Sequence, residues 1–485
     1  MSVTRPQTSR WRATALTVAM SLVLGACAIA PASKAPPEAA KAENLGLLPG
    51  PAWQGPQAQW WHQLGDAQLD DWVAAALSQQ PSLAVAQSRI AQVDALYDDA
   101  KAQTRVQVQG EAQAMRQRFP EHSLYPPPLA GSWESTGTLK VGGKWALDLF
   151  GRERAQIEAA VGQQEAARLD LQQARNALSA QVVREYLRLA RAVAQQQTWQ
   201  ERLKVRETQL ALVAARRKAG LDTQIDVHQG EQGLSEIRLQ LDQSREQAAL
   251  SRHALEALSA KPAGSASALS PSLEGIKRLA LQPGLSADLL AHRADVQAAQ
   301  ARIRAATAQQ AYARALFFPD ISLSAFVGFE SIGLDELLKG GSRMMGLGPA
   351  LHLPLFESGR LKAYHAQQQA QLDAAVLQYN QQVLGVVREA ADVGSSWQSV
   401  LGQEATQRQA LDAAQAQHQL VQARAGRGIG GDLPVLQAKL QVLAQRAVWQ
   451  DLQWRALDTQ AQLAYVLGGG LPLQPSPSLA QAPGR

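Results

Sequence analysis

The stretch that decides the fold is residues 209–229, QLALVAARRKAGLDTQIDVHQ, because the chain repeats it at residues 417–437 as QHQLVQARAGRGIGGDLPVLQ. Eight residues are identical at a constant spacing of 208 positions, including one arginine and one glycine in each copy. Gly151-Arg152 recurs as Gly359-Arg360 at the same spacing. A long internal repeat of this kind indicates two copies of one structural unit.

Long helices run into and out of both copies of this stretch. Residues 152–218 contain no proline, and their apolar side chains recur at helical spacing. The positions that keep one face are Leu171, Leu178, Val182, Tyr186, Leu189 and Val193. Such a helix extends about 100 Å at 1.5 Å per residue, and Gly220 then ends it in a turn. The pattern predicts one helical hairpin over 152–260 and a second over 359–467.

The segments before each hairpin change to a period of two, which is typical of strands with one apolar face. This alternation covers residues 104–115 and 133–149 in the first half, and 319–330 and 343–356 in the second. Runs of about ten residues suit tilted strands that cross a membrane. No stretch after residue 27 is apolar enough for a transmembrane helix, so any membrane-crossing part is expected to consist of these strands.

Four strands are too few to close a barrel. A membrane sheet with open edges leaves backbone groups unpaired, and known closed barrels have about eight strands or more. The chain is therefore expected to share its strands with further copies of itself. Two copies would supply eight strands and three would supply twelve, and the residues alone leave both numbers open.

The first residues indicate a targeting signal. Residues 1–26 combine arginines with an apolar run of about a dozen residues, and Cys27 follows Leu24-Gly25-Ala26. This pattern predicts a lipoprotein signal peptide whose cleavage leaves lipid on Cys27, and the alternative is a free thiol after an ordinary signal. Cys27 is the only cysteine, which excludes a disulfide within the chain. Residues 27–58, rich in Pro, Ala and Gly, are expected to form a lipidated tether.

The composition excludes several classes of function. The net charge is +5, and removal of residues 1–26 with their three arginines leaves 44 basic and 42 acidic residues, or +2. A nucleic-acid-binding surface is therefore not expected. The eight histidines are scattered without metal-ligand or catalytic spacing, so we expect no metal, no cofactor besides the lipid, and no enzymatic activity.

These patterns divide the rest of the chain into two repeats, a linker and a tail. The first repeat covers residues 59–260, the second covers 285–468, and a linker rich in Pro, Ser and Gly lies at 261–284. The last residues, 469–485, indicate a low-complexity tail. Further helices are expected before the strand pairs, at residues 66–79, 82–102 and 286–317.

Short motifs occur in a fixed order along the mature chain. They are Trp60-Trp61 with Asp66, residues 145–152 (WALDLFGR), 293–303 (RADVQAAQARI), 317–323 (FFPDISL), Pro354-Leu355-Phe356 with Gly359-Arg360, and Leu467 to Gly470. Each motif alone is weak, but their order and spacing are specific. Together they resemble the outer membrane factor family of Gram-negative bacteria, the TolC and OprM group, and most closely its NodT-type lipoprotein branch that serves RND efflux pumps.

The resemblance implies a mainly α fold with a transmembrane β-barrel. In that family a homotrimer forms an α-helical barrel across the periplasm and a shared 12-stranded β-barrel in the outer membrane, with four strands per chain. The protein is then anchored by lipid in the cell outer membrane and extends into the periplasm. A periplasmic membrane-fusion adaptor and an inner-membrane RND-type pump supply it.

The implied function is an exit duct that passively exports small molecules such as drugs or aromatic compounds. The alternative within the same fold is a TolC-like duct for type I protein secretion. A periplasmic coiled-coil scaffold is a third interpretation, but it does not require strands with lipid-facing apolar stripes. An envelope enzyme lacks any catalytic constellation in this sequence.

In the family the two hairpin turns are the periplasmic tips that meet the adaptor. The resemblance assigns this contact to Gly220, Leu221, Thr223, Gly428 and Ile429. The alternative is ordinary turn chemistry, since glycine supplies the positive φ that ends many helices. The second turn, with the sequence GRGIGG, holds more glycine than the first. We therefore expect the second hairpin to move more when the entrance opens.

Three charged residues are candidates for the entrance gate. Arg216 and Arg424 precede the turn glycines by one helical turn, where an Arg-Tyr pair helps to close the entrance in the family. The following residues here are Arg217 and Ala425, so the family's lock is incomplete, and compensation of the helix dipole is an equal alternative. Asp412 would form an acidic ring if three copies face a narrow axis, and a solvated surface aspartate is its alternative.

Overall fold

A computed structural model of the chain describes residues 34–45, 56–122, 124–281, 288–354 and 357–470. Cys27 and the expected signal peptide lie outside the described residues. The helices and strands, in chain order, are α2 (Ala67–Gln79), α3 (Pro81–Gln103), β1 (Gln107–Arg118), β2 (Trp133–Leu147), α4 (Arg152–Lys218), α5 (Gln224–Leu258), α6 (Asp288–His292), α7 (Ala294–Ala315), β3 (Asp320–Ile332), β4 (Arg343–His352), α8 (Ser358–Ala425) and α9 (Asp432–Val466). Short 3₁₀ helices lie at Ala42–Leu45, Trp60–Leu64, Leu273–Gly275 and Gly340–Ser342.

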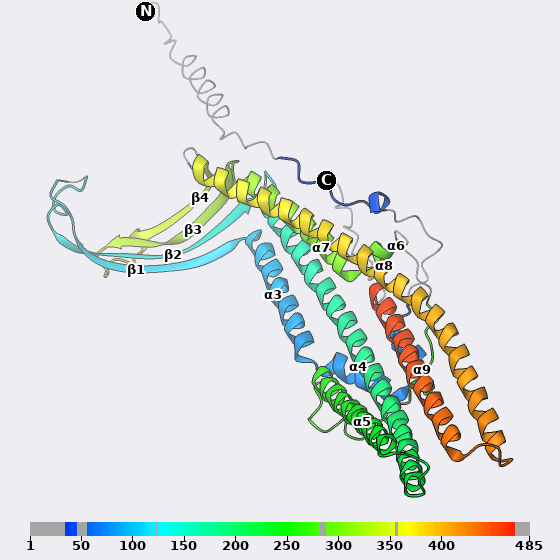
Figure 1. Cartoon of the computed structure of the whole chain (residues 1–485). Helices are drawn as coiled ribbons and strands as arrows, with labels where there is room; N and C mark the ends of the chain where they lie inside the picture. Colours follow the sequence, from blue (N-terminus) through cyan, green and yellow to red (C-terminus); the bar gives the residue numbers. More distant parts are fainter. Residues whose placement is uncertain (1–33, 46–55, 123, 282–287, 355–356, 471–485) are drawn as a thin grey trace, which may run out of the picture. The chain divides into compact units, whose positions relative to one another are not determined.

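The same order of elements occurs twice: a short helix, a longer helix, two strands and a helical hairpin (Figure 1). The outgoing helices α4 and α8 have 67 and 68 residues, and the returning helices α5 and α9 both have 35. The predicted fold class, mainly α with two repeats and four strands per chain, is confirmed. Among the residues that the structure describes, no helix is both long and apolar enough to cross a membrane.

The chain packs into two compact units, and neither unit coincides with a repeat. Unit 1 contains residues 89–167 and 299–379, which include all four strands. Unit 2 contains residues 40–88, 168–298 and the chain from 380 onward, which include both hairpin turns. Each unit draws on both repeats, so the repeat boundaries describe the sequence and not the packing.

Unit 1 contains one antiparallel sheet in the order β1–β2–β3–β4 (Figure 1). Val141 of β2 lies opposite Gly110 of β1 and opposite Val327 of β3, and Val327 lies opposite Met345 of β4. Since side chains alternate between faces along a strand, most apolar residues of these four strands share one face, while Met115, Phe326 and Met344 lie on the other. The period-two pattern of the sequence is thus a property of the whole sheet.

This apolar face is exposed in the single chain. Val327, Met345 and Leu347 are 60%, 79% and 75% exposed. The opposite face is more polar and carries an ion pair between Lys140 and Glu111 at 2.9 Å. Exposed apolar surface of this extent marks a contact with lipid or with a partner, and an apolar outer face is what a membrane-embedded sheet requires.

The helices of unit 1 pack closely through small residues. Gly162 of α4 faces Ala305 of α7, and a Cβ atom at position 162 would lie 2.8 Å from the Ala305 nitrogen. Glycine therefore permits the close approach of α4 and α7. Arg304 of α7 forms an ion pair with Glu165 of α4 beside this contact.

Unit 2 has a hydrophobic core that combines α2, α4, α5 and α9 with the segment 261–281. Trp60 and Leu64 are almost fully buried in it. Asp66 caps the start of α2, and the Tyr186 hydroxyl donates to its carboxylate at 2.7 Å. Burial, together with this hydrogen bond, raises the pKa of Tyr186 above its ordinary value. The segment between the repeats is thus part of the core.

Polar pairs join α4 to α9 within unit 2. Arg184 donates to Asp458 through Nε at 2.8 Å and Nη2 at 3.1 Å. Further along, the buried Thr198 hydroxyl donates to the side chain of Gln450 at 2.9 Å. These contacts link the first hairpin to the second.

The helix expected over 286–317 is wrong as a single element. Its described part is divided into α6 and α7, because Arg293 leaves the helical path and its side chain is drawn into a buried polar cluster. The short helix α6 and the long helix α7 thus meet at one residue that binds to other parts of unit 2.

The strand boundaries also differ from the expected ones: β1 ends at Arg118 and not at 115, β2 ends at Leu147 and not at 149, and β3 spans Asp320–Ile332 and not 319–330. β1 begins at Gln107 and not at 104, because Thr104 still bonds to the preceding helix through the Lys101 carbonyl and accepts from the Trp145 indole at 3.2 Å. β4 ends at His352 and not at 356, and residues 355–356 lie outside the described part of the chain.

Candidate functional site at the two hairpin turns

The first turn joins α4 to α5 and is held by backbone and side-chain bonds together. The Leu221 N–H donates to the Arg216 carbonyl at 2.9 Å, and Gly220 has a φ of 77°. This is the Schellman arrangement, in which glycine takes the left-handed conformation. The Arg216 guanidinium donates to both oxygens of Asp222 at 2.9 and 3.1 Å. The hydrogen bond to Asp222 raises the pKa of Arg216.

A capping box completes the first turn. Thr223 is the N-cap of α5, and its backbone N–H donates to the Asp226 carboxylate at 2.7 Å. The Asp226 N–H donates in return to the Thr223 hydroxyl at 3.4 Å. Two backbone donors at the helix start are thereby satisfied. The hydrogen bonds from Thr223 lower the pKa of Asp226.

The second turn joins α8 to α9 with the same backbone geometry. The Ile429 N–H donates to the Arg424 carbonyl at 3.0 Å, and Gly428 has a φ of 76°. Each of these residues lies 208 positions after its counterpart in the first turn. The repeat in the sequence is therefore a repeat of one turn structure.

The side-chain bonds of the first turn have no counterpart in the second. Gly430 stands where the first turn has Asp222, and Gly431 stands at the N-cap in place of Thr223. Gly431 provides no side-chain cap. Within the described residues, the Arg424 side chain makes no hydrogen bond or ion pair. The second turn is held by its backbone alone.

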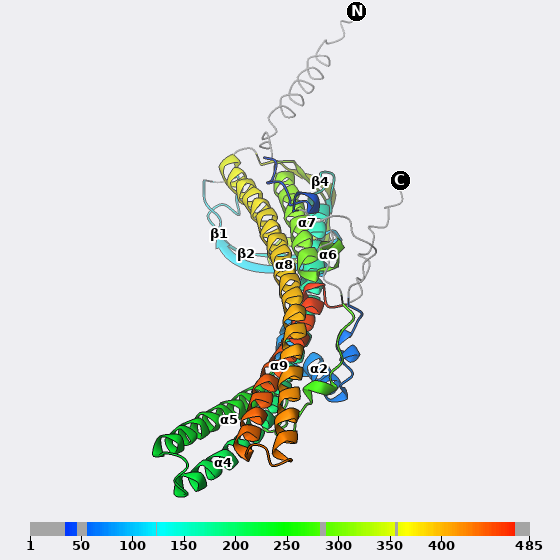
Figure 2. The same cartoon turned by 45° about the vertical axis from the view of Figure 1, so that its right-hand side comes forward.

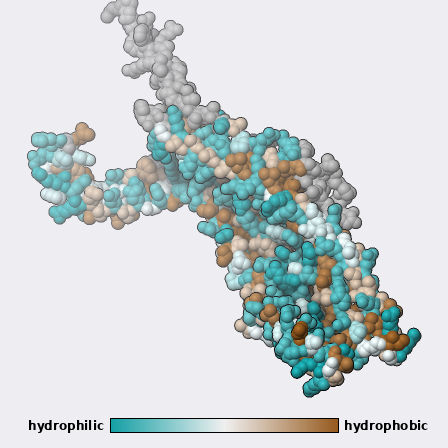
Figure 3. Space-filling view, viewed as in Figure 1, coloured by the Kyte–Doolittle hydropathy of each residue, from teal (hydrophilic) through white to brown (hydrophobic). Residues whose placement is uncertain are grey.

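The two turns lie at the same end of unit 2 (Figures 1 and 2). Leu221 and Ile429 are 66% and 65% exposed at equivalent positions. Hydrophobic residues lie among hydrophilic ones in this region of the surface (Figure 3). The five tip residues singled out from the sequence thus lie in two separate turns at one end of unit 2.

The three gate candidates are not brought together in the single chain. Arg216 is bound within the first turn, and Arg424 lies exposed at the end of α8. Asp412 lies further up α8 and pairs with Arg408 at 3.3 Å, with 55% and 60% of the two side chains exposed. An ion pair this exposed contributes little to stability, about 0–1 kcal/mol.

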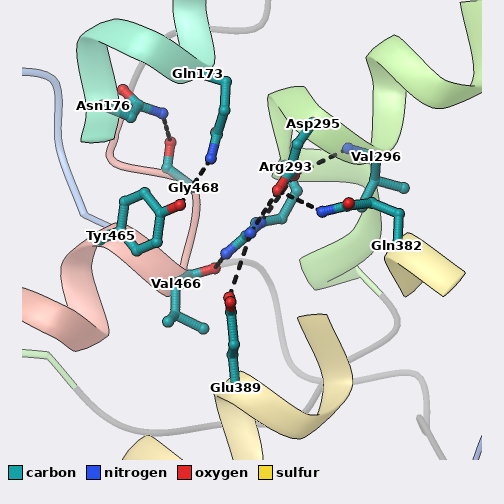
Figure 4. Close-up of polar contacts among 10 residues, drawn as sticks. All are labelled: Gln173, Asn176, Arg293, Asp295, Val296, Gln382, Glu389, Tyr465, Val466 and Gly468. Atoms are coloured by element: carbon teal, nitrogen blue, oxygen red, sulfur yellow. Dashed lines mark hydrogen bonds and ion pairs between the residues drawn. The ribbon is translucent and has the colours of Figure 1, made fainter. Parts of the chain in front are cut away.

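A second polar site, to which the sequence analysis assigned no role, surrounds Arg293 between α6 and α7 (Figure 4). Arg293 is only 2% exposed. Its guanidinium donates to both oxygens of Asp295 at 3.0 and 2.5 Å, and to the Val466 carbonyl at the end of α9 at 3.1 Å. It also donates to Glu389 of α8 at 3.5 Å. We call these four residues the Arg293 cluster.

Neighbouring groups support the Arg293 cluster. The Asp295 carboxylate also accepts from the Gln382 amide of α8 at 2.8 Å (Figure 4). The Tyr465 ring lies 5.3 Å from the guanidinium carbon. Burial opposes the charge of Arg293, but the hydrogen bonds and charge of Asp295 outweigh it and raise the pKa of Arg293. The arginine is therefore a buried cation with ionic partners.

The sequence held one signal for this site, the motif Arg293-Ala-Asp295-Val296, which served only as a family signature. An arginine two residues before an aspartate does not reveal burial. Within the described residues, no group of His, Cys, Asp and Glu is arranged to hold a metal ion.

The fold and the site together define a class of protein. The chain combines an antiparallel sheet that has an exposed apolar face with two long helical hairpins whose turns lie at one end of unit 2, which is consistent with a channel subunit for a membrane. Comparison with known families identifies the class: the family of outer membrane efflux proteins matches residues 72–261 and 285–469. The chain belongs to the outer membrane efflux protein family.

Individual relatives agree with this assignment. Fusaric acid resistance protein FusA of Burkholderia cepacia is 33% identical over 359 residues, which are 71% of this chain and 67% of that protein. Multidrug resistance outer membrane protein MdtP of Escherichia coli is 28% identical over 470 residues, which are 93% of this chain and 95% of that protein.

Solved structures show the same similarity. The outer membrane protein VceC of Vibrio cholerae has a TM-score of 0.78 and 31% identity, and the match covers 86% of this chain and 99% of VceC. The outer-membrane channel OprN has a TM-score of 0.78 and 25% identity, with coverage of 92% and 99%. This chain is therefore an efflux channel protein of the outer membrane.

Proposed function

We propose that this protein is the exit duct of a tripartite efflux system. It passively conducts small molecules from a periplasmic adaptor and an inner-membrane RND-type pump to the exterior. The observation that carries the proposal is the pair of equivalent turns, each with an exposed apolar residue, at one end of unit 2. Paired turns of this kind suit docking by a partner that recognises both repeats.

The assembly is proposed to be a homotrimer. β1 and β4 are the edges of the sheet in one chain, and edges within a membrane need partners. Three copies would supply twelve strands to one barrel, as the family resemblance implies. Cross-linking of the detergent-solubilised protein should give trimers, and a monomer that resists all association would contradict the shared barrel.

The adaptor contact is proposed at Gly220, Leu221, Thr223, Gly428 and Ile429. Exposed apolar anchors with a polar surround are typical of interface hot spots. Leu221→Asp and Ile429→Asp should leave the trimer intact and abolish efflux. Leu124→Asp is the control, because Leu124 is a fully exposed leucine in the loop between β1 and β2. Normal efflux by both tip variants would refute this contact.

The transported class is proposed to be amphiphilic drugs or aromatic acids, in line with relatives named for multidrug and fusaric acid resistance. Deletion of the gene together with a partner pump should increase sensitivity to such compounds. Unchanged sensitivity to a broad panel, together with loss of a secreted protein from the medium, would instead favour type I secretion.

Lipid on Cys27 is proposed as the membrane anchor. The small residues before Cys27 support this assignment. Metabolic labelling with palmitate should mark the protein that retains Cys27 and leave the variant Cys27→Ser unlabelled. Equal labelling of both proteins would show that the lipid is elsewhere.

The gate is proposed to involve Arg216, Arg424 and Asp412. The lack of a partner for Arg424 within the described residues supports a contact with a neighbouring chain of the trimer. Arg424→Ala should therefore increase ion leak through the closed duct more than Arg216→Ala. Asp412→Asn should reduce the cation preference of the duct if three copies form an acidic ring, and an unchanged preference would exclude the ring.

A further inference from the structure

Each repeat has one residue, directly before the helix that precedes its strands, that donates to the last carbonyls of its own hairpin. In repeat 1, the Gln80 amide donates to the carbonyls of Ala257 and Leu258 at 3.3 and 3.1 Å, at the end of α5. In repeat 2, Arg293 donates to the carbonyl of Val466 at 3.1 Å, at the end of α9. Gln80 precedes α3 as Arg293 precedes α7, so the two side chains hold equivalent places.

The two residues differ in charge and in reach. In the described part of the chain, the side chain of Gln80 bonds only to the end of α5. Arg293 also reaches α8 directly through Glu389, and Asp295 reaches α8 through Gln382. The positions 208 residues before Glu389 and Gln382 are Gln181 and Ala174. Repeat 1 therefore has no ionic counterpart of the Arg293 cluster on α4.

The cluster joins the two helices of the second hairpin at a place remote from the turn. Val466 is the last residue of α9, and Glu389 lies 36 positions before the end of α8 at Ala425. The turn itself has glycine in place of both side-chain locks of the first turn. The second hairpin is thus held at its base by the hydrogen bonds and ion pairs of the Arg293 cluster. Its tip lacks the side-chain bonds of the first turn.

We propose that Arg293 is a positioning residue of the efflux duct. Its buried guanidinium fixes the base of the second hairpin through the Val466 carbonyl and Glu389, and thereby sets the resting place of the second tip. This rests on the proposed function, since a resting place matters only if the tip opens and closes. The movement of the tip then pivots at the cluster.

The decisive variant is Glu389→Gln. It removes the charge of the α8 contact but keeps the size of the side chain, and Arg293 stays paired with Asp295. Glu389 is 43% exposed, so the variant leaves no buried group unpaired and the trimer should melt at the same temperature. We expect hydrogen exchange across residues 417–437 to rise by about twofold to fivefold, the range for a partly exposed ion pair. Exchange across residues 209–229 should stay unchanged.

Gln80→Ala is the matched control. It removes the bonds to the equivalent carbonyls in repeat 1 and touches no ionic contact. It should leave exchange in residues 417–437 unchanged. Arg293→Lys should behave like Glu389→Gln in exchange, because a lysine keeps the charge but loses the fork that joins three partners at once.

Conductance in planar bilayers then separates this inference from the proposed function. The unmodified trimer should conduct, and Glu389→Gln should raise the fraction of time spent open. A conducting unmodified trimer with unchanged exchange and open time in Glu389→Gln would overturn the positioning role alone. If neither the unmodified trimer nor Arg424→Ala conducts, the proposed function is overturned, whatever the exchange shows.

Discussion

The two helical hairpins have nearly the same lengths and the same turn backbone, yet ionic side-chain contacts hold them at opposite ends. The first hairpin is locked at its turn by the Arg216–Asp222 ion pair and by a capping box, and a neutral amide closes its base. The second hairpin has Gly430-Gly431 at its turn and the buried Arg293 cluster at its base. Ionic side-chain contacts thus hold the first copy of the repeated unit at its turn and the second copy at its base.

A repeated backbone therefore does not determine which end of a hairpin is held by ionic or capping side chains. Both turns satisfy the same helix-end carbonyls through glycine, so backbone geometry is equal. Side chains at a few equivalent positions decide which end resists opening. The greater movement expected of the glycine-rich second turn stays a prediction, which the removal or addition of these side chains tests.

The largest effect is expected at the base of the second hairpin. Arg293→Met leaves the carboxylate of Asp295, 16% exposed, without its ionic partner. Removal of one member of a buried ion pair costs about 3–5 kcal/mol. Gln80→Ala, at the equivalent place, should cost about 1 kcal/mol as a neutral hydrogen bond does. Thermal unfolding of the purified trimer measures both, and equal losses would remove the distinction between the two bases.

Loss of the turn glycines should have an intermediate and equal effect in both hairpins. Gly220→Ala and Gly428→Ala place a side chain where φ is 77° and 76°. An added Cβ meets no atom within 4 Å at either site, so only the left-handed backbone opposes it, at about 1–2 kcal/mol. Unfolding of the two variants should coincide. A clear difference between them would show that the turns are not equivalent in backbone.

Removal of the N-cap at Thr223 should leave the first turn without a capping side chain, as the second turn is at Gly431. Thr223→Ala loses the N-cap of α5, which typically costs about 1 kcal/mol, and hydrogen exchange at residues 224–227 should rise about fivefold. Thr223→Ser keeps a capping hydroxyl and serves as the control. If the alanine variant exchanged as slowly as the unmodified protein, the cap would not be what holds this tip.

The smallest effect is expected from adding a cap to the second tip. Gly431→Ser supplies the hydroxyl that position 223 has in the first repeat. Since glycine is only a few tenths of a kcal/mol worse than serine at an N-cap, exchange at the start of α9 should slow by less than about twofold. Faster exchange in this variant would mean that Gly431 is needed for a backbone conformation that serine disfavours.

Much of the fold could be predicted from the sequence because it depends on local periodicity. The end of α4 at Lys218 follows from Gly220, and the positions of the strands follow from an apolar period of two, which the register then aligns on one face. These features depend on neighbours within a few residues. The tip residues were found for the same reason, since both turns lie within one repeated stretch.

The Arg293 cluster could not be predicted in this way. Its partners Glu389 and Val466 lie 96 and 173 positions away in the chain, and no local pattern reveals such contacts. The spacing of equivalent residues also changes, from 208 in the hairpins to 213 between Gln80 and Arg293. An alignment of the two repeats at the constant spacing of 208 therefore does not pair Gln80 with Arg293, and so it does not reveal that only the second base is charged.

The two packing units also limit how this gene can be divided. Because each unit is built from both repeats, a polypeptide cut between the repeats would leave β2 without its neighbour β3 and split the core of unit 2. The halves should rebuild the fold only when they are produced together, as a split protein. A shorter ancestral gene with a single repeat would have needed twice as many copies to enclose the same lumen.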